Sequence, residues 1–131
     1  MKLTLLKLSY AIEIGAYLAY IGHYKRSNDF RVKCIALEEL RHMIMIRDIL
    51  QDHNTTPSKF FNSVFFVIGM IIKHLCRITP KRLLNLVAGV LEIFNVVNYN
   101  YLGRKFPDHY YEFTEMAECE YEHEVYFLAK S

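Results

Sequence analysis

The sequence predicts an all-α protein of four long helices, with a fifth helical segment joining the two pairs. Only five Gly and three Pro occur in 131 residues, too few for the many turns of a β-sandwich. Hydrophobic residues make up 53% and charged residues 23%, which excludes a disordered chain. Chains of this length usually form one domain, so we expect a single domain over 1–131.

The first two helices are expected to form an antiparallel hairpin. The first should cover about 3–26 and end at Ser27-Asn28-Asp29, which supply turn and N-cap chemistry. The second should cover about 30–52, because its apolar residues approximate a helical stripe.

The second half of the chain is predicted to hold a crossover and another hairpin. The helices are expected at about 57–76, 80–102 and 108–129. Thr56-Pro57 and Thr79-Pro80 each suggest an N-cap followed by Pro at the first helical position. Gly103 to Pro107 should form the last turn. As a helix, Pro57–Leu75 would span about 28 Å, enough to return the chain along the first hairpin.

The crossover is apolar and has basic flanks. Its uninterrupted apolar run, Val64–Ile72, is nine residues long, whereas spanning a bilayer takes about 20 residues, so we predict no transmembrane span there. No Asp or Glu occurs from His53 to Leu91. This pattern fits either a solvated basic rim or peripheral contact of residues 60–76 with anionic lipid headgroups, and composition leaves both open.

Charge and cysteine usage limit the partners and the compartment. A net charge of +2 is too small to indicate nucleic-acid binding. The cysteines at 34, 76 and 119 form no Cys-x-x-Cys pair, which fits a reducing compartment and thiols that serve as small core residues. No signal peptide is recognisable, so we expect a cytoplasmic protein. If the protein associates with a membrane, we expect it to lie peripherally on the inner face of that membrane.

Two Glu-x-x-His motifs carry the candidate chemistry, Glu39-Leu-Arg-His42 and Glu120-Tyr-Glu-His123. Residues three apart on a helix share a face, so each motif directs a carboxylate and an imidazole the same way. Two further carboxylates stand alone in apolar surroundings. Glu13 is the only acidic residue before Asp29, and Glu92 is the only one between Asp52 and Asp108. A lone ionised carboxylate on a buried stripe is unfavourable without a compensating cation.

Hairpin geometry places these residues level with one another. Glu13 and Glu39 are equidistant from position 26, and Glu92 and Glu120 are equidistant from position 106, where the two turns are expected. Each hairpin should therefore set one Glu beside one Glu-x-x-His pair. Each lone Glu is also followed by Ile and, seven residues on, by a Tyr: Tyr20 and Tyr99.

Four Glu and two His from four helices form the ligand set of ferritin-like di-iron and di-manganese bundles. The predicted fold is accordingly a ferritin-like four-helix bundle, two antiparallel hairpins joined by a long helical crossover. The predicted metal ligands are Glu13, Glu39, His42, Glu92, Glu120 and His123. The set suits two iron ions, and the same ligands would take manganese or a mixed iron–manganese pair.

Local sequence adds a resemblance. The string Glu13-Ile-Gly15-Ala16-Tyr-Leu-Ala-Tyr20-Ile-Gly22 resembles the first ligand helix of demethoxyubiquinone hydroxylases, a family of ubiquinone biosynthesis. Glu92 followed by Tyr99-Asn100 and Arg104 is similar to that family's third ligand helix, and Glu120-x-Glu-His123 to its last. The resemblance spans all four ligand helices and assigns the same six residues as iron ligands.

The resemblance implies an O₂-activating di-iron monooxygenase that hydroxylates a lipophilic, quinone-like substrate, with an electron donor and interfacial membrane attachment around 60–76. Tyr20 and Tyr99 are candidates for the substrate pocket, although core aromatics are the commoner use of such residues. Two alternatives stay open: a rubrerythrin-like peroxidase or ferroxidase, and a metal-free helical interaction module. A homo-oligomer is compatible with all three.

Overall fold

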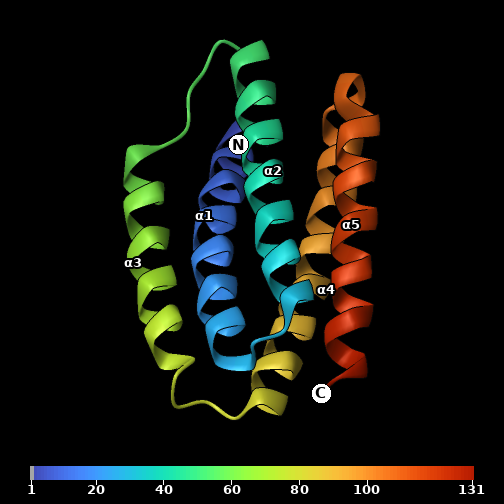
Figure 1. Cartoon of the computed structure of the whole chain (residues 1–131). Helices are drawn as coiled ribbons and strands as arrows, with labels where there is room; N and C mark the ends of the chain where they lie inside the picture. The colour runs from blue at the N-terminus through green and yellow to red at the C-terminus, as the bar shows by residue number, and fades with distance from the viewer. Residues whose placement is uncertain (1) are drawn as a thin grey trace. The chain divides into compact units, whose positions relative to one another are not determined.

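The computed structural model describes residues 2–131; Met1, with which the predicted domain begins, lies outside them. The elements are α1 (Lys2–Ser27), α2 (Phe30–Asp52), α3 (Lys59–Leu75), α4 (Lys81–Lys105), the short 3₁₀ helix η1 (Pro107–His109) and α5 (Tyr110–Ala129) (Figure 1). The described residues contain no β-strand. The prediction of an all-α chain is therefore confirmed.

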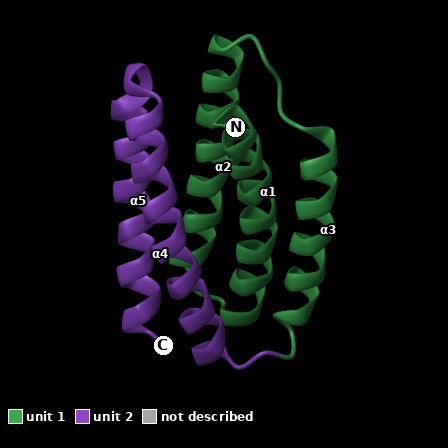
Figure 2. Cartoon of the chain, turned by 180° about the vertical axis from the view of Figure 1, so that it is seen from behind, with its two compact units in different colours: residues 1–78 green, residues 79–131 purple. Residues whose placement is uncertain are grey.

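The chain divides into two compact units, coloured separately in Figure 2. Unit 1, residues 1–78, carries α1, α2 and α3. Unit 2, residues 79–131, carries α4, η1 and α5. The single domain expected over 1–131 stays a prediction.

In unit 1, α1 packs against both α2 and α3 (Figure 1). The link between α1 and α2 is as short as predicted, because Asn28 takes a left-handed backbone (φ 54) and Asp29 caps α2 by accepting a hydrogen bond from Arg31 N–H at 3.1 Å. The chain then returns along α3, which runs parallel to α1. The predicted first hairpin is therefore present, and a third helix follows it where the crossover was expected.

Glycines allow α1 and α3 to approach closely. A Cβ at Gly15 would lie 3.1 Å from the Phe65 carbonyl oxygen, and one at Gly22 would lie 2.6 Å from Lys73 Cα. Gly69 of α3 faces Gly15 in turn, its added Cβ 2.9 Å from Gly15 Cα. The backbones of α1 and α3 are therefore in direct contact here, and larger side chains at the three glycine positions would push the two helices apart.

We expect Gly22→Ala to destabilise the protein by about 1–3 kcal/mol, because the added methyl group meets backbone atoms that cannot move alone. Gly103→Ala is the matched control. Its Cβ would meet Phe113 Cβ at an ordinary 3.4 Å, so it should be neutral or stabilise by up to about 1 kcal/mol through helix propensity. Urea denaturation measures the free energy of unfolding of both variants. An equal change in this free energy in the two variants would contradict the close contact between α1 and α3.

The starts of α3 and α4 differ from the predicted ones. The crossover was expected over 57–76 with Pro57 as its first residue, but α3 begins at Lys59 because Ser58 is the N-cap and accepts a hydrogen bond from Phe61 N–H at 3.1 Å. The next helix was expected at 80–102, but Pro80 is itself the N-cap and α4 begins at Lys81. In both cases Pro precedes the first helical turn rather than opening it.

The turn in unit 2 is shorter than predicted. The helix α4 does not stop at Leu102 but continues through Gly103 to Lys105, because Gly103 keeps a helical backbone and packs on Phe113. Pro107 then opens η1, and α5 begins at Tyr110 instead of 108. The two long helices of this unit pack against each other along their length as a hairpin.

Apolar side chains are exposed on both α3 and α4. On α3 these include Phe60, Val67 and Ile71, each more than half exposed. In the described part of the chain, α4 is the one helix long and apolar enough to cross a membrane by length and composition, and 22% of its most apolar window is buried. That window surrounds the buried carboxylate of Glu92.

Cys76, the first residue after α3, is the most protected of the three thiols at 2% exposure. Burial raises the pKa of the Cys76 thiol above its usual value. Because alkylation requires the thiolate, we expect Cys76 to react more slowly with iodoacetamide near pH 8 than Cys34 or Cys119, which are partly exposed. Mass spectrometry of the partly labelled native chain measures the order in which the three cysteines react. In urea-unfolded protein the three cysteines should react at similar rates.

Candidate metal centre

Unit 1 gathers three of the predicted ligands into one buried triad. Glu13 lies midway along α1, and Glu39 and His42 lie one turn apart on α2. All three are at most 1% exposed, and their candidate ligand atoms lie within 4.8 Å of one another. His42 Nδ1 is 3.9 Å from Glu13 Oε2. The structure therefore brings together the three residues that the spacing about position 26 sets level, and their role as metal ligands stays a prediction.

Unit 2 repeats the arrangement with Glu92 on α4 and Glu120 and His123 on α5. These residues are fully buried, and their candidate ligand atoms again lie within 4.8 Å of one another. His123 Nδ1 is 3.0 Å from Glu120 Oε2 and 3.7 Å from Glu92 Oε2. One imidazole nitrogen thus faces two carboxylates.

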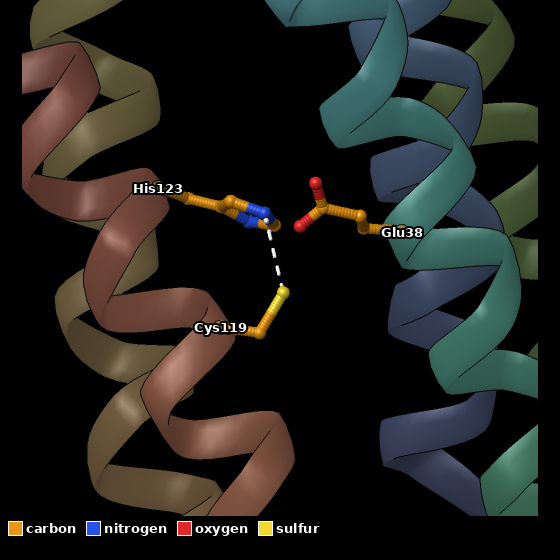
Figure 3. Close-up of side chains that lie close together, drawn as sticks. All are labelled: Glu38, Cys119 and His123. Atoms are coloured by element: carbon orange, nitrogen blue, oxygen red, sulfur yellow. Dashed lines mark hydrogen bonds between the residues drawn. The ribbon is translucent and has the colours of Figure 1, made fainter.

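The other nitrogen of His123 contacts a residue that the sequence did not single out. Cys119, four residues earlier on α5, has its Sγ 3.5 Å from His123 Nε2 (Figure 3). A carboxylate at Nδ1 calls for the Nδ1–H tautomer, in which Nε2 accepts a hydrogen bond from the thiol. The only available signal was the i, i+4 spacing before the histidine, which is too common to identify a partner.

The equivalent position in unit 1 is occupied differently. Glu38 stands four residues before His42, as Cys119 stands before His123. The Glu38 carboxylate accepts a hydrogen bond from Arg31 Nη1 at 2.7 Å. The two triads are therefore alike in their three candidate ligands and unlike in the residue one turn before the histidine.

Tyr20 and Tyr99 are both buried, at 6% and 1% exposure. The Tyr99 ring stacks on Phe113, with centroids 6.3 Å apart, and Tyr20 lies beside His23. Two pockets, one in each unit, are lined by other residues. The substrate role of the two tyrosines stays a prediction, and their observed contacts are those of core aromatics.

The donor chemistry fits a transition-metal ion in each triad. Each triad offers two carboxylates and one imidazole, a mixture typical of iron and manganese, and lacks the thiolates that characterise structural zinc sites. Burial of the donors excludes bulk water and strengthens their attraction for a cation. Four carboxylates also carry the charge that two divalent ions would neutralise.

Comparison with known proteins assigns no relative to this chain. No protein-family model matches it, and neither the curated proteins nor the solved structures contain a match.

Proposed function

We propose that the chain is a ferritin-like four-helix bundle in which the two triads together hold two iron ions. In this proposal α1 and α2 form one hairpin, α4 and α5 form the other, and α3 is the crossover. The observation that carries the proposal is the repeat: each unit buries one Glu beside one Glu-x-x-His pair, with the ligand atoms within 4.8 Å.

The proposed activity is that of an O₂-dependent oxidoreductase, a monooxygenase of a lipophilic, quinone-like substrate. Two iron ions bound here would supply the redox chemistry and open coordination positions that reaction with O₂ requires. The residues of the chain would bind and orient the ions through four carboxylates and two neutral imidazoles. Their burial would keep water from the reacting atoms.

The exposed apolar side chains of α3 support peripheral membrane contact through residues 60–76, and with it a lipophilic substrate. The face of α3 that does not pack on α1 exposes apolar side chains over most of its length: Phe60, Val64, Phe66, Val67, Ile68, Ile71, Ile72 and Leu75. No acidic residue interrupts this stretch. An apolar face of this kind would let a substrate dissolved in lipid reach the protein without crossing bulk water.

The test is elemental analysis of protein made with iron supplied, together with liposome co-sedimentation and a product assay on quinone precursors. We expect about two iron ions per chain, loss of iron in Glu92→Ala, and co-sedimentation with liposomes. Iron without membrane binding would favour the peroxidase or ferroxidase. Protein free of metal, with unchanged stability in Glu92→Ala, would contradict the proposal.

A further inference from the structure

Unit 1 contains a pocket of about 350 Å³ lined by Gly22, Lys25, Arg26, Lys73, His74 and Arg77. We propose that this basic pocket binds a phosphate-bearing anion. It has none of the proposed iron ligands among its lining residues, so the proposal is independent of the metal centre.

Helix packing creates the pocket. Because α1 and α3 run parallel, their C-terminal ends lie at the same end of unit 1, and each last turn is basic: Lys25 and Arg26 in α1, Lys73 and His74 in α3. Gly22 is buried and lets the Lys73 backbone approach α1 directly. Side chains that are 48 residues apart in sequence, such as Lys25 and Lys73, therefore surround one cavity.

The charge balance of the pocket is positive. Two lysines and two arginines line it, and no carboxylate does so among the described residues. Cations at helix C-termini have an ordinary structural explanation, since each terminus carries about −0.5 charge. Two termini would offset only about one of the three positive charges of Lys25, Lys73 and Arg77. The remaining excess, held around a concave surface, favours an anion of high charge.

The side chains indicate which anion. Guanidinium groups bind phosphate through paired hydrogen bonds, and lysine adds a mobile point charge, so mixed Arg and Lys favour a phosphomonoester or diphosphate over a single carboxylate. The volume lies at the lower end for small-molecule sites. Exposed Ile72, Leu75 and Ile78 come from the same stretch of chain, so the phosphate can belong to a lipid headgroup or to a soluble ligand.

The test uses the full chain and two probes: sodium pyrophosphate in calorimetric titration, and phosphatidylcholine vesicles with or without phosphatidic acid in co-sedimentation. The variant Lys73→Gln/Arg77→Gln removes two cations from the pocket. Lys81→Gln/Arg82→Gln is the matched control, because it removes the same charge from exposed positions outside the pocket. Circular dichroism checks that both variants fold.

We expect wild-type protein to bind at least one probe, the pocket variant to bind it at least tenfold more weakly, and the control to change it much less. Pyrophosphate binding without vesicle binding would identify a soluble phosphate ligand. Binding only to the acidic vesicles would identify a lipid headgroup. Equal weakening in both variants, which indicates diffuse surface charge, or no binding of either probe, would overturn the proposal.

Discussion

Glu120→Gln should remove the metal-induced stabilisation that the unit 2 triad supplies, while leaving the metal-free protein as stable as wild type, or more stable. Glu120 is fully buried beside His123 on α5. Without metal, replacing a buried carboxylate by a neutral amide of the same shape removes a desolvation cost. With metal, the same change removes a charged ligand, so the two effects on stability have opposite signs.

Thermal unfolding with and without Fe²⁺ or Mn²⁺ under anaerobic conditions measures both effects. A metal ion at one hundred times its dissociation constant for the unit 2 triad should stabilise the wild-type protein by about 2.7 kcal/mol through that site, a contribution that Glu120→Gln should lose. Glu122→Gln is the matched control, since Glu122 lies two residues further on the same helix and is exposed. A metal-dependent shift that is equal in all three proteins would contradict a metal site at the triad.

The triads could be predicted from sequence because they depend on regular geometry. The rise per residue is constant in a helix. Two residues that are equally many positions from the turn of a helical hairpin therefore lie at the same level along its axis, whatever their side chains are. Glu13 with Glu39, and Glu92 with Glu120, needed only an approximate position for each turn. The end of α4 moved from Leu102 to Lys105 and the start of α5 moved from 108 to Tyr110, yet Glu92 still lies beside Glu120 and His123.

Features that depend on contacts between helices were not predictable in the same way. Gly15 and Gly22 were recognised as parts of a string, but their role in bringing α3 against α1 appears only once the partner backbone is in place. Helix starts failed for a related reason. Thr56-Pro57 and Ser58 both offer caps, and only the hydrogen bond from Phe61 N–H to Ser58 distinguishes them.

Cys119→Ala should weaken metal binding in unit 2 by about 10–100-fold, the usual effect of losing a group that orients a ligand. A metal ion on His123 Nδ1 requires the lone pair there, which moves the ring proton to Nε2. The Cys119 sulfur, 3.5 Å from Nε2, can then accept that proton's hydrogen bond, whereas in the metal-free protein the thiol donates to the same nitrogen. Alanine can do neither.

Competition titration with Zn²⁺ measures the affinity, and ¹⁵N spectra of labelled histidine report the tautomer of His123. Cys119→Ser keeps both a donor and an acceptor at Nε2, so it should retain most of the affinity, while Cys119→Ala should lose affinity and shift the Nε2 resonance of His123. Cys34→Ala removes a thiol of similar exposure from α2 and should leave both measurements unchanged. A Cys119→Ala protein with wild-type affinity and spectra would show that hydrogen bonding at Nε2 does not contribute to metal binding.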